Sequence, residues 1–218
     1  MCVYAGTYIG AEVLSHCPPG AELVDSKGLN LDQITDHLVR AHAAGQDVAR
    51  LCSGDPSIYS ALAEQTRRLD AAGVPWDVTP GVPAYAAAAA LVGRELTVPE
   101  VAQTVILTRT QAASTAMPES ESLAQLAKSH ATLVLHLAIR RTRELAAELA
   151  VEYGDDCPVV VVADASRETE VILRGTLADI ADAVEAQGLR QAAVIMVGPA
   201  LQAADFVESH LYGARPRP

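Results

Sequence analysis

A glycine turn between an apolar run and a helical pattern constrains the fold of this chain more than any other feature. The turn is Ser53–Pro56, which follows a strand predicted over Asp47–Cys52 and precedes a helix predicted over Ser57–Ala72. Gly54 accommodates a positive φ, and Asp55 followed by proline is a favoured helix start. The pattern suits an ordinary capped turn, and it equally suits a ligand site at the carboxyl end of a parallel strand.

A second turn of the same kind follows the next predicted strand. Pro80-Gly81 lies between a strand predicted over Trp76–Thr79 and an alanine-rich helix predicted over Ala84–Leu91. Turns after consecutive parallel strands open on the same edge of a sheet, so the two turns are expected to line one cleft. The repeated strand–turn–helix order predicts an α/β fold with a mostly parallel sheet and helices on its faces.

The remainder of the chain predicts a second α/β lobe. The rhythm breaks at Arg94–Glu100, where a proline and charged residues separate apolar runs, so we place one domain at 1–100 and a second at 101–218. Helices are predicted over Arg141–Val151 and Leu177–Ala186. Strands are predicted over Thr104–Thr108, Thr132–Leu137, Val159–Ala163, Glu170–Arg174 (hairpin-like) and Ala192–Val197.

Charge and composition exclude several classes of protein. The 218 residues carry 16 basic and 27 acidic side chains, a net charge of −11 that argues against broad nucleic-acid binding. The longest apolar stretch, Ala84–Val92, is far shorter than the roughly 20 residues that span a bilayer, and no signal peptide opens the chain. Four dispersed cysteines form no C-x-x-C pair. We expect a soluble cytoplasmic protein without membrane or nucleic-acid partners.

The familiar motifs of metal and nucleotide chemistry are missing. The sequence contains no G-x-x-x-x-G-K-[ST], no G-x-G-x-x-G after a strand and no H-E-x-x-H, and its six histidines have no metal-ligand spacing. A nucleotide-dependent reductase and a metal site are therefore not predicted. No triad-like arrangement of nucleophile and base is present either, so no catalytic residue is assigned.

Five ordered segments together resemble the tetrapyrrole (corrin/porphyrin) methylase family. Within it, the Thr-Val-Ile-Leu-Thr-Arg segment and the following Pro-Glu loop favour members that methylate precorrin-4 at C-11 in cobalamin biosynthesis. The resemblance implies two α/β domains with an S-adenosylmethionine (SAM)-binding cleft between them, a tetrapyrrole substrate and a homodimer. The segments are Ser53–Tyr59, Thr79–Val82, Glu95–Glu100, Thr104–Arg109 and Ala116–Glu119.

The resemblance also implies which residues contact the cofactor. In the first domain these belong to the Gly-Asp-Pro turn and to the residues after Pro80-Gly81. In the second domain they belong to two strand ends and an Ala-Asp-Ala turn. The implied cofactor-binding residues are Ser53, Gly54, Asp55, Ile58, Pro83, Ala84, Leu137, Ala138, Ala165 and Pro199.

Arginines are the candidate substrate-binding residues, because a precorrin carries several carboxylates and guanidinium groups bind carboxylates in pairs of hydrogen bonds. Arg109 lies at a predicted strand end and Arg94 lies near the domain junction. A cluster at Arg140–Arg143 is a weaker candidate, since basic residues at a helix start are usually solvated.

The start of the sequence departs from the family pattern. Family members open with an apolar strand and a Gly-rich loop ahead of a Val-x-Tyr-Ala segment, whereas Cys2–Ala5 already stands at the start here, and Pro83 replaces a common Ser or Thr. The resemblance therefore describes an N-terminally truncated fold, with reduced stability and weak methyl transfer expected. Alternative functions are methylation of another precorrin or of cobalt-precorrin-4, and a non-catalytic SAM- or tetrapyrrole-binding form.

Overall fold

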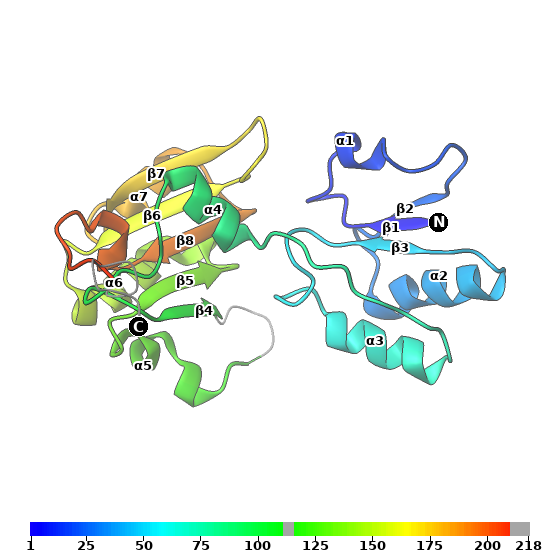
Figure 1. The fold of residues 1–218 in the computed structure, drawn as a ribbon, viewed down its shortest axis with the longest axis horizontal. Coiled ribbons are helices and arrows are strands. Elements are labelled where there is room, and N and C mark those ends of the chain that lie inside the picture. The colour runs from blue at the N-terminus through cyan, green and yellow to red at the C-terminus, as the bar shows by residue number, and fades with distance from the viewer. Residues whose placement is uncertain (111–115, 210–218) are drawn as a thin grey trace, which may run out of the picture. The chain divides into compact units, whose positions relative to one another are not determined.

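The computed structural model describes residues 1–110 and 116–209 and divides the chain into two compact units, Met1–Pro83 and Ala84–Pro218 (Figure 1). The boundary lies earlier than the predicted division at 100/101. The reason is that helix α4 (Ala84–Val92) packs through Ala88 and Val92 into the core of the second unit. Each unit has its own sheet.

The first unit contains a short, fully parallel sheet. Its strands are β1 (Cys2–Tyr4), β2 (Leu23–Asp25) and β3 (Ala49–Leu51), in the order β2-β1-β3. The register aligns Val3 with Val24 on one side and with Arg50 on the other. All three strands therefore end at the same edge, and the sheet is parallel as the βα rhythm predicted, although only β3 lies in a strand predicted from the sequence.

Helices of the first unit cover a small core. Helix α2 (Leu31–Ala43) and helix α3 (Leu62–Ala71) pack with β1 around four buried side chains, while α1 (Ala11–Leu14) buries none of its residues. Helix α2 begins with a capping box in which Asn30 and Gln33 satisfy each other's backbone N–H groups. The buried core residues are Val3, Ile34, Leu38 and Leu69.

Two predictions for the first unit differ from the structure. The helix predicted to begin at Ser57 begins at Leu62, because Tyr59 (φ 53°) and Ala61 (φ 56°) adopt left-handed conformations that a helix does not contain. The segment Trp76–Thr79 forms no strand. Strand β3 is the edge of the sheet on that side, and Trp76 remains 46% exposed.

The second unit contains a five-stranded sheet in the order β4-β5-β8-β6-β7. Strands β4 and β5 are parallel, β8 is antiparallel to both of its neighbours, and β7 is antiparallel to β6. This sheet is therefore mixed, and a short connection joins β6 to β7 as a hairpin, in agreement with the hairpin-like pattern predicted at Glu170–Arg174. The strands are β4 (Val105–Arg109), β5 (Thr132–His136), β6 (Pro158–Ala163), β7 (Val171–Thr176) and β8 (Ala193–Val197).

Both faces of the five-stranded sheet are buried. Its central strands are continuous apolar runs, and successive side chains of a strand point to opposite faces, so apolar side chains cover both. Leu133 and Leu135 pack with helices on one face, whereas Val134 packs with α4 on the other (Figure 1). The helices on the first face are α5 (Leu123–Ala127), α6 (Thr142–Tyr153) and α7 (Ile180–Ala186). Three 3-10 turns complete the unit: η1 (Glu119–Glu121), η2 (Ile139–Arg141) and η3 (Pro199–Gln202).

No helix in the described part of the chain is long and apolar enough to cross a membrane.

Candidate cofactor and substrate site

The two glycine turns predicted from the sequence meet in the first unit. Gly54, at the carboxyl end of β3, has φ 71°. A Cβ atom added to Gly81 would lie 2.1 Å from the carbonyl oxygen of Gly54, so only glycine allows this approach of the two backbones. The two turns therefore lie side by side, although the segment before Pro80-Gly81 is not the strand that the sequence predicted.

Asp55 joins the two turns. One carboxylate oxygen accepts a hydrogen bond from the backbone N–H of Ser57 (2.8 Å) and from the Ser57 hydroxyl, and the other accepts from the backbone N–H of Gly81 (2.8 Å). These three donors, the Ser57 hydroxyl first, hold the pKa of the Asp55 carboxyl below its usual value. Asp55 is thus not the cap of α3 that its sequence context predicted. It fastens one turn to the other.

The same edge carries a third glycine contact. Asp25, at the end of β2, accepts hydrogen bonds through Oδ1 from the backbone N–H groups of Gly6 (3.0 Å) and Lys27 (2.8 Å). A Cβ atom on Gly6 would lie 2.2 Å from the other carboxylate oxygen of Asp25. The sequence analysis did not identify the pair of Gly6 and Asp25. The signal that could have revealed it is an acidic residue at the end of one strand together with a glycine just after the preceding strand.

The remaining predicted cofactor residues of this region surround the two turns in the sequence. Ser53 and Gly54 are exposed, whereas Asp55, Ile58 and Pro83 are half-buried. Ala84, also exposed, opens helix α4 of the second unit. Backbone atoms at Ser53, Gly54 and Gly81 are therefore accessible to a ligand at the carboxyl edge of a parallel sheet, where small molecules commonly bind in α/β proteins.

A second group of predicted residues gathers at one edge of the five-stranded sheet. Arg109 ends β4, and Leu137 follows His136, which ends the parallel neighbour β5. The Ala165 turn follows β6, which runs in the same direction because both β5 and β6 are antiparallel to β8. Leu137, Ala138, Ala165 and Arg109 are thus brought to one edge by the sheet.

Backbone strain is concentrated at this edge. Leu137 has φ 55° and is 66% exposed, and Asp164, Ser166 and Ala192 have φ values of 48°, 65° and 52°. Residues with a Cβ atom seldom adopt positive φ, and such strain is common where a ligand is bound. Asp164 is anchored by its backbone N–H, which donates to the Ala192 carbonyl (2.9 Å). Asp164, which belongs to the predicted Ala-Asp-Ala turn, and Ala192 are further candidate site residues, and no sequence pattern pointed to Ala192.

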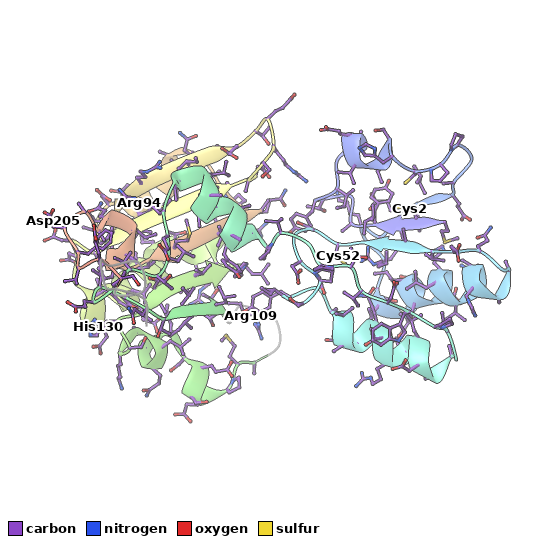
Figure 2. The ribbon with its side chains drawn as sticks, in the orientation of Figure 1. Cys2, Cys52, Arg94, Arg109, His130 and Asp205 are labelled. Atoms are coloured by element: carbon purple, nitrogen blue, oxygen red, sulfur yellow. The ribbon has the colours of Figure 1, made fainter. Side chains whose placement is uncertain are left out.

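Pro199 and Arg94 lie at the opposite edge of this sheet. The register pairs Val197 with Leu133, so Gly198 and Pro199 follow β8 beside the start of β5. The Arg94 guanidinium donates to the carbonyl of Ala203, just beyond η3 (3.3 Å). Figure 2 shows Arg94 and Arg109 well separated within the second unit. The structure therefore does not bring Pro199 or Arg94 together with the other predicted residues.

His136 is the polar neighbour that strand register places beside Arg109. Burial lowers the pKa of its imidazole, which is therefore neutral at physiological pH and adds no positive charge next to the arginine. No sequence pattern pointed to His136, because it becomes a neighbour of Arg109 only when β4 and β5 pair.

A cavity of about 210 Å³ adjoins the end of β4. Half-buried Arg109 and Arg141 line it, with the buried Thr108 and Thr110 and the half-buried Met117. Three glutamates, Glu119, Glu121 and Glu148, also line it, and their side chains are exposed and solvated. The cavity offers guanidinium donors of the kind that bind carboxylates.

Comparison with known proteins assigns the chain to a family. The model of the Tetrapyrrole (Corrin/Porphyrin) Methylases matches residues 2–181, so the chain belongs to this family. A precorrin-4 C(11)-methyltransferase of Rhodococcus erythropolis is 56% identical over 98% of this chain and 86% of the relative. The solved structure of a cobalt precorrin-4 methyltransferase superposes with a TM-score of 0.88, at 36% identity over 93% of this chain and 84% of that one.

A further solved structure bears on the cofactor. A uroporphyrin-III C-methyl transferase from Thermus thermophilus, complexed with S-adenyl homocysteine, superposes with a TM-score of 0.72. It is 25% identical to this chain and the match covers 92% of this chain and 86% of that one.

Proposed function

We propose that this chain transfers a methyl group from SAM to C-11 of precorrin-4, the activity of a precorrin-4 C(11)-methyltransferase in cobalamin biosynthesis. The observation that carries this proposal is the 56% identity, over 98% of the chain, to a relative with that name. The chain is a SAM-dependent methyltransferase of the tetrapyrrole methylase family.

The residues of the first unit fit a nucleoside cofactor. Gly54 and Gly81 present exposed backbone at the carboxyl edge of the sheet, and Asp55 locks the two turns in place. We propose that Ser53, Gly54, Asp55 and Ile58 bind the cofactor in this unit, together with Pro83. When bound, SAM supplies an electrophilic sulfonium methyl group. The chain contributes orientation and exclusion of water, which together can supply several kcal/mol of the barrier.

In the second unit we propose Leu137, Ala138 and Ala165 as cofactor contacts, with Asp164 and Ala192 beside them. Support comes from their gathering at one sheet edge and from the positive φ values there. Ala84, at the start of α4, completes the proposed set. Pro199 is left out, because it lies at the other edge.

We propose that Arg109 binds a carboxylate of the tetrapyrrole. It is half-buried, it lines the cavity at the end of β4, and neutral His136 lies beside it in the register. Arg94 is left out of this site because it lies at the opposite edge. Arg109→Leu is expected to raise the KM for the precorrin about tenfold and to leave SAM affinity unchanged. Loss of SAM affinity in a folded variant would contradict this role.

Cobalt-precorrin-4 is the alternative substrate, favoured by the TM-score of 0.88 to a cobalt precorrin-4 methyltransferase. The macrocycle would carry the metal in that case. The test is to incubate the purified chain and SAM with precorrin-4 or with cobalt-precorrin-4, and to follow methylation by mass spectrometry. Faster methylation of precorrin-4 supports the proposal, faster methylation of the cobalt form supports the alternative, and methylation of neither contradicts both.

We also propose that the chain works as a homodimer in the cytoplasm. The family resemblance supports the homodimer. The cytoplasmic location is supported by the four cysteines of the chain, which are all free thiols: Cys2, Cys17, Cys52 and Cys157. Light scattering on the purified chain tests the oligomeric state, and a monomer at assay concentration would contradict it.

A further inference from the structure

A buried glutamine lies behind the loop of residues 53–61, the 53–61 loop. Gln65, in the first turn of α3, is only 5% exposed. Its side-chain Nε2 donates hydrogen bonds to the carbonyl oxygens of Ser60 and Ala61, both at 3.1 Å. These carbonyls belong to the segment where Tyr59 and Ala61 take left-handed conformations, so the glutamine bonds directly to the strained end of the loop.

Arg50 determines which way the Gln65 amide faces. The Arg50 Nε donates to Gln65 Oε1 (3.2 Å), and its Nη1 donates to the carbonyls of Val3 (3.3 Å) and Leu51 (3.0 Å). A guanidinium group can only donate, so the amide oxygen must face Arg50 and the NH₂ group must face the loop. The contact thus runs from the β1 and β3 backbones, through two side chains, to the loop.

The loop is therefore held at both ends. At its front, Asp55 accepts from the Gly81 N–H; at its rear, Gln65 donates to the Ser60 and Ala61 carbonyls. Of the residues proposed to contact the cofactor in this unit, Asp55 and Ile58 lie within this span, and Ser53 and Gly54 directly precede it. The proposed function gives a role to Asp55 at the front contact and none to Gln65 at the rear contact.

We propose that Gln65, oriented by Arg50, is a positioning residue that holds the 53–61 loop in its cofactor-binding conformation. This inference rests on the proposed function, because the loop is taken to bind SAM. Glutamate cannot replace glutamine in this role. A carboxylate at position 65 would keep the bond from Arg50 but would turn an acceptor toward two carbonyl acceptors.

The test uses the full chain and measures SAM affinity by calorimetry, together with KM and kcat for precorrin-4. Gln65→Glu and Gln65→Met are expected to weaken SAM affinity about tenfold, because two hydrogen bonds to the loop are lost. The KM for precorrin-4, measured at saturating SAM, is expected to stay unchanged. The matched control is Gln125→Met, an exposed glutamine in the second unit, which is expected to alter none of these values.

The outcomes separate this inference from the proposed function. Absence of SAM binding and of methyl transfer in the wild-type chain would overturn the proposed function. Wild-type binding with equal SAM affinity in Gln65→Glu and Gln65→Met would overturn only the role of Gln65. Fluorescence of Trp76, the single tryptophan of the chain, reports whether the first unit remains folded in each variant.

Hydrogen–deuterium exchange on the wild-type chain gives a test that needs no substitution. Residues 53–61 are expected to exchange more slowly than 74–79, which form no strand, and SAM is expected to slow the first segment further. Equal exchange in the two segments, with no effect of SAM on 53–61, would overturn the proposal.

Discussion

The two units of this chain are stabilised in different ways. Among the described residues, six hydrophobic side chains are buried in Met1–Pro83, against thirty-one in Ala84–Pro218. The larger unit covers both faces of its sheet with helices, whereas the smaller unit has strands of three residues and a core cluster of four buried side chains. The second unit depends on apolar burial, which is the dominant favourable contribution to folding.

Polar contacts take a larger part in the first unit. Arg50 and Gln65 tie one loop to the sheet, and Asp55 joins the two glycine turns. Arg68 joins α3 to α2 through Asp32 (2.9 Å). Hydrogen bonds of this kind add about 1 kcal/mol each, and an exposed ion pair adds less. Specific polar contacts therefore position the glycine turns, whereas apolar packing stabilises the second unit.

Separating the units is expected to give the largest effect. A fragment of residues 84–218 should fold cooperatively, because its core is complete within the fragment. A fragment of residues 1–83 should not, because so few side chains are buried in it. Circular dichroism during heating checks both fragments. A cooperative transition in the shorter fragment, reported by Trp76 fluorescence, would show that its polar contacts suffice.

Replacing one core leucine in each unit measures how tightly each core is packed. Leu135→Ala in the second unit is expected to lower the free energy of unfolding by about 3 kcal/mol, because Leu135 is 1% exposed and surrounded by packed side chains. Leu38 is 6% exposed in the smaller cluster, and Leu38→Ala is expected to lower the free energy of unfolding by about 2 kcal/mol. The change in Trp76 fluorescence on unfolding should then occur at a lower urea concentration than in the wild-type chain. Equal costs would mean that the two cores are packed alike.

Gly81→Ala tests the contact between the turns. The added Cβ would overlap the Gly54 carbonyl, so the turns must separate, and SAM affinity is expected to fall about thirtyfold. The matched control is Gly10→Ala, where no atom lies within 4 Å of the new Cβ and φ is −82°. Calorimetry with SAM measures both. Unchanged affinity in Gly81→Ala would show that the contact between the turns is not needed for binding.

Alkaline pH is expected to destabilise the second unit. Burial raises the pKa of the Cys157 thiol from 9.0 to about 11 and that of Tyr153 from 10.0 to about 12. Because the folded state favours the protonated forms, their stabilisation is present below pH 9 and is lost as pH rises toward 12. The melting temperature should fall over this range. Cys157→Ala should remove part of the fall, and an identical pH profile in that variant would exclude the thiol as a cause.

Acid pH is expected to affect the first unit through Asp55. The pKa of its carboxyl is lowered below 3.8, chiefly by the Ser57 hydroxyl, so its stabilisation is present above pH 3.8 and is lost as pH falls through the folded-state pKa. Trp76 fluorescence during acid titration measures this change. Asp55→Asn should flatten the acid limb of the curve. This is the smallest expected effect, because the carboxylate lies at the surface.

Much of the fold could be predicted from local sequence patterns. Short runs of β-branched and other apolar residues placed β5, β6 and β8 within one residue of their observed ends, and the alanine run placed α4 equally well. The glycines of the two turns were recognised because glycine tolerates a positive φ, as at Gly54, and a close backbone approach, as at Gly81. These features depend on residues that are near one another in the chain.

Contacts between distant segments decided the rest. The pairing and direction of the strands make the second sheet mixed and place His136 beside Arg109. They also place Pro199 at the edge of the sheet opposite to Arg109. The role of Asp55 also changed, from a predicted helix cap to a bridge between two turns 26 residues apart. Neighbouring residues alone decide most of the strands, helices and turns of this chain, because backbone preference and apolar period are local properties. Only the tertiary structure determined which of their ends meet, because strand pairing and direction depend on packing between segments far apart in the chain.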